Sequence, residues 1–182
     1  MSESVSMKPL ALGPTGRHAA AAIAAARDKR GLTYKALSDL LSDRGWPIPI
    51  LGLRRIEAGA RRVSVDDLVA LSAALSVTPL QLLLPSEDPV DPPTGLNPDM
   101  TDSRELYAWA RSEISQSPRS REAYWLQRSI ELQDELSEAV RMEKAATYRD
   151  ARLWAERNRE RVQAQIDHAE ARLQTLLQQE DG

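Results

Sequence analysis

The sequence lacks several residue types on which enzymes and metal-binding proteins depend. Its 182 residues include no cysteine and only two histidines, His18 and His168. Disulfide frameworks, thiolate metal sites and thiol nucleophiles are therefore excluded, and two isolated histidines do not suggest a metal site or a catalytic triad. No acid pair, glycine-rich phosphate loop or nucleophile arrangement is visible. We therefore predict that the protein is not an enzyme and has no metal or cofactor.

Phenylalanine is also absent, and the other aromatic residues are four tryptophans and four tyrosines. Apolar residues make up 42% of the chain, so any core is built mainly from leucine, isoleucine, valine and alanine. Such residues suit packed helices. No signal peptide and no long apolar run is present, and we therefore expect a cytoplasmic protein without membrane contact.

The two signs of charge are unevenly distributed along the chain, whose net charge is −3. Residues 1–85 carry eleven basic and seven acidic side chains. Residues 86–100 carry four acids and no base, and residues 101–182 carry thirteen bases and sixteen acids. The positive excess therefore belongs to the first half, an asymmetry that indicates nucleic-acid contact there.

Composition and the positions of prolines and glycines divide the chain into four parts. Residues 1–16 contain two prolines and two glycines and are interpreted as a flexible arm. Residues 17–85 are expected to form a compact all-α domain. Residues 86–100, with four prolines and four acids, are typical of a linker. Residues 101–182 are expected to be helical, with a first helix that starts at Thr101 or Ser103 and ends near Pro118.

Start and stop signals predict five short helices in the first domain. An alanine-rich segment ends before Gly31, and Thr33 is a suitable N-cap for the next helix. Pro49 suits the first turn of a third helix. Ser64 with Asp67 forms a variant capping box, and Thr78-Pro79 repeats a start signal. The expected helices span residues 17–30, 33–43, 49–57, 64–75 and 79–84.

The second and third of these helices outline a helix-turn-helix. The apolar positions of the second are Leu37, Leu40 and Leu41, and those of the third are Ile50, Leu53 and Ile56. The third helix then stops near Gly59. A helix presented in this way fits the DNA major groove, where base edges are accessible.

These residues carry a resemblance to a known family. Residues 17–85 resemble the lambda-repressor-like, XRE-type DNA-binding domains of bacterial and phage regulators. The matching pieces occur in the family's order and are Leu32-Thr33, Leu37, Leu40-Leu41, Leu53-Arg54-Arg55-Ile56-Glu57-Ala58-Gly59, Arg61-Arg62 and the segment Val65 to Leu80. The turn is longer than usual, with Arg44-Gly45-Trp46-Pro47, and is similar to a variant common among actinobacterial regulators. The resemblance covers about 70 of the 182 residues.

The resemblance implies roles for individual side chains in binding double-stranded DNA. Thr33, Tyr34 and Lys35 would face the backbone of one DNA strand. The outward positions of the third helix would be Pro49, Ile50, Leu51, Gly52, Arg54 and Arg55, with Arg55 placed to read a guanine. Arg61 and Arg62 would neutralise phosphates. Ile50 and Leu51 are unusual on such a face and suit contact with thymine methyl groups.

Several of these residues could have a purely structural role instead. Arg54 and Arg55 would then be a surface pair that bridges to a nearby acid, and Trp46 would be a small hydrophobic plug. Glu57 is interpreted as structural, holding the turn after the third helix. His18 is expected on the surface near the start of the first helix, and His168 on a solvated flank.

The region from Arg119 to Asp181 contains neither proline nor glycine and favours either one long helix or two helices of a hairpin. Near its end, five apolar residues follow a spacing of four, three, four and three: Val162, Ile166, Ala169, Leu173 and Leu176. That spacing is typical of a coiled-coil seam, and these residues are predicted to form a homodimer interface.

Together these features predict a sequence-specific transcriptional regulator, a repressor that acts as a dimer on an inverted-repeat operator. The alternative is a protein-interaction module, antitoxin-like or phage-related, that binds a protein partner through its long C-terminal helix. The side chains that separate the two functions are Arg54, Arg55, Arg61 and Arg62. If all four are dispensable, DNA reading is not the function.

Overall fold

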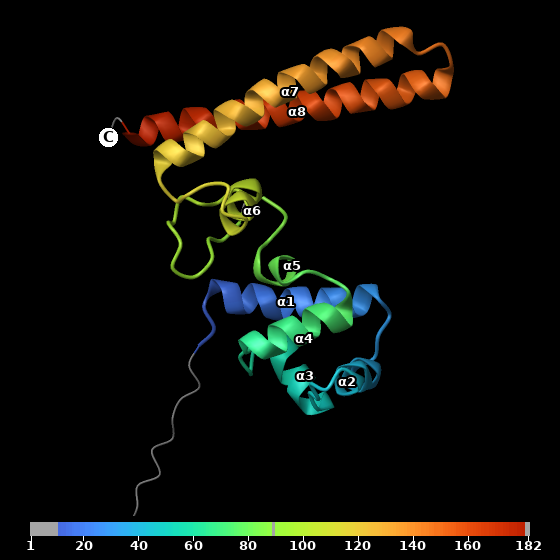
Figure 1. Cartoon of the computed structure of the whole chain (residues 1–182), viewed down its shortest axis with the longest axis vertical. Helices are drawn as coiled ribbons and strands as arrows, with labels where there is room; N and C mark the ends of the chain where they lie inside the picture. Colours follow the sequence, from blue (N-terminus) through green and yellow to red (C-terminus); the bar gives the residue numbers. More distant parts are fainter. Residues whose placement is uncertain (1–10, 89, 181–182) are drawn as a thin grey trace, which may run out of the picture. The chain divides into compact units, whose positions relative to one another are not determined.

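The structure, a computed structural model, describes residues 11–88 and 90–180 of the chain. Within these residues the secondary structure consists of eight α-helices and no strand, which confirms the all-α prediction. The chain divides into two compact units, Met1–Arg111 and Ser112–Gly182 (Figure 1). In the described part of the chain, no helix is both long and apolar enough to cross a membrane.

The five predicted N-terminal helices are all present in the first unit, each within three residues of its predicted ends. They are α1 (Pro14–Lys29), α2 (Tyr34–Asp43), α3 (Ile50–Glu57), α4 (Val65–Leu75) and α5 (Pro79–Leu83). The helix α1 begins earlier than expected because Pro14 occupies its first turn, where a missing N–H has no cost. Residues 1–10 of the expected N-terminal arm lie outside the described residues.

Side-chain caps fix where these helices begin. The Thr33 hydroxyl accepts a hydrogen bond from the Ala36 N–H at 3.1 Å. Capping boxes join Ser64 with Asp67 and Thr78 with Gln81, so that each pair satisfies two backbone N–H groups. The caps that the sequence predicted at Thr33, Ser64 and Thr78 are therefore confirmed.

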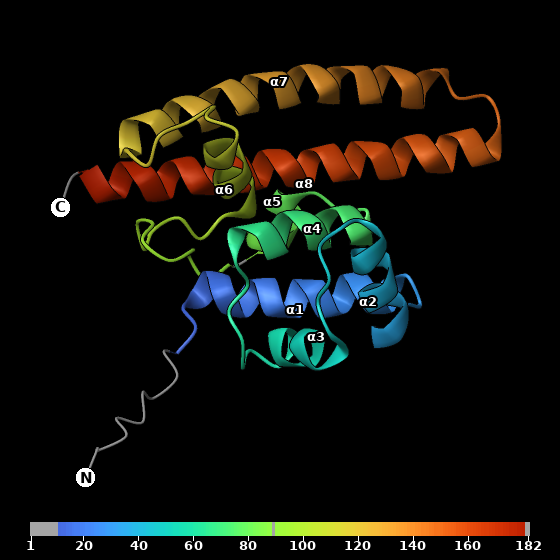
Figure 2. The same cartoon turned by 60° about the horizontal axis from the view of Figure 1, so that its bottom comes forward.

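The core of the first unit is aliphatic, as the absence of phenylalanine required. Its fully buried residues come from all five helices and the turn before α3: Ile23, Leu37, Leu41, Ile48, Leu53, Ile56, Leu71, Ala74, Leu75 and Leu82. The long helix α1 packs against α3, α4 and α5, while α2 packs against α3 and α4 (Figure 2). This packing presents the outer face of α3 to solvent.

Residues 86–100 are part of the first unit and do not behave as the predicted linker. Val90 and Met100 are buried with Leu84 and Leu106 in a second apolar cluster. The Val90 N–H also donates a hydrogen bond to the Thr101 carbonyl at 3.0 Å. The prolines and acids suggested an extended segment, but two apolar side chains provide enough burial to fold it against the helices.

The division between the units falls after Arg111, later than the sequence predicted. The helix α6 (Ser103–Ala110) begins at a cap supplied by Asp102 and belongs to the first unit. It ends well before Pro118, near Ser112, whose positive φ of 62° is incompatible with a continuing helix. The expected helical region 101–182 is therefore split between the two units.

The second unit is an antiparallel helical hairpin. It consists of α7 (Pro118–Ala145) and α8 (Arg149–Glu180), which lie side by side along their length in both views (Figures 1 and 2). Of the two arrangements that the sequence left open, the chain adopts the hairpin. Trp125 and Leu132 of α7 form its buried core together with residues of α8.

The predicted coiled-coil seam faces the chain's own α7 and not a second copy. Val162, Ile166, Ala169 and Leu176 are buried in the hairpin core, and Leu173 is partly buried beside them. The prediction that these five residues form the dimer interface is therefore corrected. A heptad-like spacing predicts a helical partner, but it does not specify whether that partner belongs to the same chain.

Candidate DNA-binding surface

The turn between α2 and α3 is held by hydrogen bonds to the end of α2. The Ser38 hydroxyl donates to the Ile48 carbonyl at 2.7 Å, and the Trp46 backbone N–H donates to the Leu41 carbonyl at 3.0 Å. Ile48 is itself buried in the domain core. The longer turn therefore has a defined conformation and sets where α3 begins.

The outer face of α3 combines apolar and basic side chains. Leu53 and Ile56 are buried, whereas Ile50 is 39% exposed and Leu51 is 58% exposed. Pro49, Arg54 and Arg55 are also exposed. All five of these outward residues were predicted for this face from the resemblance.

Gly52 does not share that outer face. A Cβ atom at Gly52 would lie 3.0 Å from Arg61 Nη1 and 3.1 Å from Ile48 Cγ2. The residue therefore lies against the turn and the loop that follows α3. A side chain there would press on Ile48 and on the end of the flexible Arg61 side chain, and the contact of Gly52 with DNA stays a prediction.

Glu57 anchors the end of α3 to α1 and α2. Its carboxylate accepts two hydrogen bonds from Arg27, at 2.7 and 2.9 Å, and one from the Tyr34 hydroxyl at 2.8 Å. The Arg27 guanidinium also lies over the Tyr34 ring, 4.3 Å from its centroid. The Arg27 and Glu57 side chains are both largely buried. Glu57 therefore has the structural role that the sequence suggested, and it also joins three helices.

The hydrogen bonds of this cluster shift the acid–base equilibria of its members. The bond to the Glu57 carboxylate raises the pKa of Arg27 and is also the main reason why the pKa of Tyr34 is raised. The tyrosine proton is retained because the hydroxyl donates it in a hydrogen bond to the Glu57 carboxylate. Arg54 lies over the same ring, its guanidinium carbon 5.3 Å from the centroid, and this contact restrains Arg54 at the edge of the outer face.

The beginning of α2 has one side chain available for an external contact. The Thr33 hydroxyl is the helix cap, and the Tyr34 hydroxyl bonds Glu57. Lys35 is exposed and pairs with Asp39, one turn further along the helix, at 2.7 Å. Thr33 and Tyr34 therefore act mainly within the fold, whereas Lys35 projects into solvent.

The loop after α3 is anchored through a buried carboxylate. Asp67 is 2% exposed and accepts hydrogen bonds from the Trp46 indole N–H at 3.1 Å and from Arg61 at 2.8 Å. Burial acts to raise the pKa of Asp67, but the bonds from Trp46 and Ser64 and the charge of Arg61 outweigh it, and the pKa is lowered. This carboxylate thereby joins the long turn to the start of α4.

The two arginines of the loop have different surroundings. Arg61 is tied to Asp67, although 38% of its side chain stays exposed. Arg62 is exposed and forms no ion pair or hydrogen bond in the described part of the chain. Sequence reasoning grouped the two as phosphate ligands, and it found neither the pairing of Arg61 with Asp67 nor that of Glu57 with Arg27. The spacing of Ser64 and Asp67 signalled a helix cap, but nothing in it indicated the ion pair to Arg61.

This geometry agrees with the comparisons to known proteins. Residues 23–82 match the family model described as helix-turn-helix. No curated protein and no solved structure shows a significant match to the chain. The first unit therefore contains a lambda-repressor-like helix-turn-helix domain, which confirms the resemblance read from the sequence. A domain of this kind supports a function in DNA-binding transcription regulation of the XRE type.

Proposed function

We propose that α3 reads a specific DNA sequence from the major groove. The observation that carries this proposal is the outer face of α3, where Arg54 and Arg55 lie exposed beside Ile50 and Leu51. The face is rigidly placed, because Leu53 and Ile56 are buried and Glu57 is bonded to α1 and α2. A rigid helix face of this kind suits base readout.

The chemistry of the face indicates which bases it reads. An arginine side chain binds the O6 and N7 atoms of guanine with two parallel hydrogen bonds, and Arg55 is the residue assigned to that contact. Ile50 and Leu51 have no polar atom in their side chains and contact thymine methyl groups in this proposal. The expected half-site therefore contains a guanine with thymines on the side of the α3 N-terminus.

Basic residues around α3 are proposed to contact phosphates. Lys35 at the start of α2 and Arg62 after α3 are exposed on the segments that flank it. Arg61 contributes with the exposed part of its side chain while it stays paired with Asp67. Such contacts supply salt-dependent affinity and set the register of the domain on DNA.

The protein is proposed to act as a dimeric repressor. One domain makes few base contacts, and two domains on an inverted repeat increase affinity through their effective concentration. The seam of α8 is filled by α7, and a dimer therefore needs another surface. Leu126 and Ile130 are 56% and 57% exposed and lie one turn apart on α7. They are the candidate contact between two copies.

Selection of bound duplexes from a random pool tests sequence reading directly. The full-length protein is compared with the Arg54→Ala, Arg55→Ala double variant at moderate salt. We expect an enriched inverted repeat that is lost in the double variant. Replacing the enriched thymines by uracil removes only the methyl groups, and we expect it to weaken binding by about fivefold for each methyl contact, if each is worth about 1 kcal/mol.

The control is Arg141→Ala, which replaces an exposed arginine of α7 in the second unit. It should preserve both the enriched sequence and the effect of uracil. Failure of the wild-type protein to enrich any sequence would exclude sequence reading. If a sequence is enriched but uracil does not weaken binding, the proposed sequence reading stands and the contacts to thymine methyl groups are excluded.

A second candidate function is binding of a protein partner through the hairpin. It is favoured by two aromatic side chains near the connection of α7 to α8, Tyr148 and Trp154, which are largely exposed. Exposed aromatic residues of this size are typical of protein interfaces. If the regulatory effect in cells survives glutamine at Arg54, Arg55 and Arg62 but is lost in Trp154→Ala, this second function is the correct one.

A further inference from the structure

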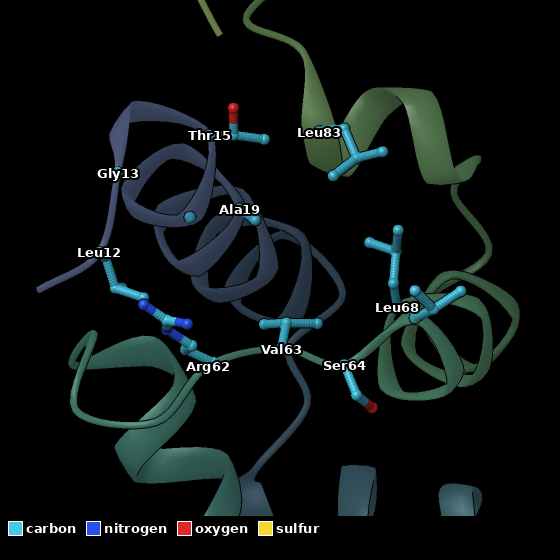
Figure 3. Close-up of a pocket in the computed structure, with 11 residues that line it drawn as sticks. Leu12, Gly13, Thr15, Ala19, Arg62, Val63, Ser64, Leu68 and Leu83 are labelled. Carbon is cyan, nitrogen blue, oxygen red and sulfur yellow. The ribbon is translucent and has the colours of Figure 1, made fainter. Parts of the chain in front are cut away.

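A pocket of about 380 Å³ lies in the first unit between α1, the loop before α4, and α5. Figure 3 shows Ala19 at its floor, Val63 and Leu68 along its wall, and Leu83 on the side opposite Leu12. Most lining side chains are aliphatic, and the volume is within the range of small-molecule sites. An apolar ligand that fills a space of this size gains free energy because it displaces water from the apolar walls.

The polar groups around this pocket are mostly engaged in the fold. The Thr15 hydroxyl accepts a hydrogen bond from the Thr94 N–H at 2.8 Å, and the Ser64 hydroxyl caps α4. Arg62 is the one charged residue among the described residues that line the pocket. In Figure 3 its side chain lies beside Leu12 at the mouth. The pocket therefore pairs an apolar interior with a single cation that makes no ion pair or hydrogen bond in the described part of the chain.

The wall of the pocket is also the loop that follows α3. Arg62, Val63, Ser64 and Val65 line the pocket, and the preceding Arg61 contacts Gly52 of α3 and pairs with Asp67. A ligand in the pocket therefore touches the segment that carries the proposed phosphate contacts.

We propose that this pocket binds a small amphiphile with an apolar body and one anionic head, and that this ligand regulates DNA binding. The apolar body occupies the space between Ala19, Leu68 and Leu83, and the head pairs with Arg62. The regulatory part of the proposal rests on the proposed DNA-binding function.

The anionic head of the ligand and a DNA phosphate compete for the guanidinium of Arg62. An Arg62 side chain that pairs with the ligand head at the pocket mouth is not available to a DNA phosphate. By linkage, DNA then weakens the ligand by the same factor by which the ligand weakens DNA. The ligand thus acts as an inducer that lowers operator affinity.

The test uses the full-length protein and the fluorescent probe anilinonaphthalene sulfonate, which combines fused apolar rings with one sulfonate. We expect saturable binding with one site per chain. Arg62→Gln should weaken the probe by about two- to fivefold, the range for an ion pair at a partly exposed site. Ala19→Leu should abolish probe binding because the larger side chain occupies the pocket.

Arg55→Gln is the matched control, because it removes an arginine that is proposed to contact DNA but does not line the pocket. It should weaken DNA binding and leave the probe unaffected, whereas folded Ala19→Leu should show the reverse. Circular dichroism melting establishes that each variant is folded, and Arg62→Gln, at an exposed position, keeps the test valid if Ala19→Leu does not fold.

The outcomes separate the two proposals. The ligand site is overturned if the probe does not bind saturably, or if its binding is unchanged in both Arg62→Gln and a folded Ala19→Leu. These results are also expected if another part of the chain or a second copy covers the pocket. Specific probe binding without any selected DNA sequence retains the site and overturns the proposed DNA function. If the probe and the selected DNA both bind specifically but do not compete with each other, the regulatory coupling is overturned.

Discussion

Glu57 joins three helices of the DNA-binding domain through one carboxylate. Its partners Arg27 and Tyr34 come from α1 and α2, and all three side chains lie behind the outer face of α3. If the carboxylate is removed, Arg27 keeps its charge in a largely buried position without its counterion. The orientation of α3 therefore depends on a residue that does not itself face solvent.

Glu57→Gln is expected to destabilise the first unit. Loss of one partner of a largely buried, hydrogen-bonded ion pair costs about 2–4 kcal/mol in the free energy of unfolding. Urea unfolding followed by circular dichroism measures this change. Asp39→Asn, in the exposed pair with Lys35, is the control and should leave the stability nearly unchanged. Equal stability of the two variants would contradict the role of Glu57.

His18 is the residue whose burial gives a pH-dependent stability. Its Nε2 atom is buried and has no hydrogen-bond partner in the described part of the chain. Burial lowers the pKa of His18 below its usual value, and a weaker hydrogen bond with the Leu84 backbone opposes the shift. The sequence predicted a surface position because nothing local indicated that residues near Leu84 cover this side of α1.

The lowered pKa of His18 means that the unfolded chain binds its proton more readily than the folded chain. The stabilising contribution is present above the unfolded pKa of about 6.5 and is lost as the pH falls through the lower folded value. Urea unfolding at pH 7.5 and pH 5 should show a smaller decline for His18→Gln than for wild type. An identical decline in the two proteins would contradict this prediction.

At the scale of elements, the hairpin of α7 and α8 is stabilised by one buried stripe on each helix. Adjacent leucines of α8 allow a direct comparison, because Leu176 is fully buried and Leu177 is 53% exposed. Both have the same helix propensity and the same chemistry. The difference between them is therefore a difference in packing alone.

Leu176→Ala is expected to lower the free energy of unfolding of the second unit by about 2–4 kcal/mol, through lost burial and a new cavity. Leu177→Ala should change it by less than about 0.5 kcal/mol, as is usual for exposed positions. Thermal unfolding of the full chain, monitored by circular dichroism, measures the change in each variant. A similar cost for the two variants would show that α8 does not pack against α7 in the register described.

At the scale of the whole molecule, the filled seam changes what a dimer requires. Once α7 covers α8, an additional copy has to use side chains that the hairpin leaves exposed, among which Leu126 and Ile130 are neighbours on α7. In the proposed dimer, a contact there joins two chains that each carry one helix-turn-helix domain. The proposed dimer is thus separable from the stability of the hairpin.

The Leu126→Glu, Ile130→Glu double variant is expected to be a folded monomer, whereas the wild-type chain is expected to be a dimer. Four like charges brought together at a two-fold interface oppose association, but they remain solvated in the monomer. Light scattering coupled to size exclusion gives the two masses. A Leu177→Glu variant controls for added charge on an exposed hairpin position. Equal dimeric masses for wild type and the double variant would place the interface elsewhere.

The sequence alone determined the features that depend on neighbouring residues. Caps at Thr33, Ser64 and Thr78 fixed where helices begin, because they satisfy N–H groups within the same turn. The resemblance to XRE-type domains gave the buried residues Leu53 and Ile56 of α3 and its exposed arginines. These local rules, with the resemblance, were sufficient for the helix-turn-helix domain.

Only the tertiary structure decided the features that depend on which distant segments meet. The apolar seam of α8 packs against α7 of the same chain. Burial of Val90 and Met100 holds the predicted linker against the first unit. The Asp67 carboxylate accepts hydrogen bonds from both Trp46 and Arg61. The spacing of apolar or charged residues specifies that a partner is needed but not its identity. Burial free energy is non-directional and is gained equally from any complementary surface, so the choice rests on chain connectivity and three-dimensional packing.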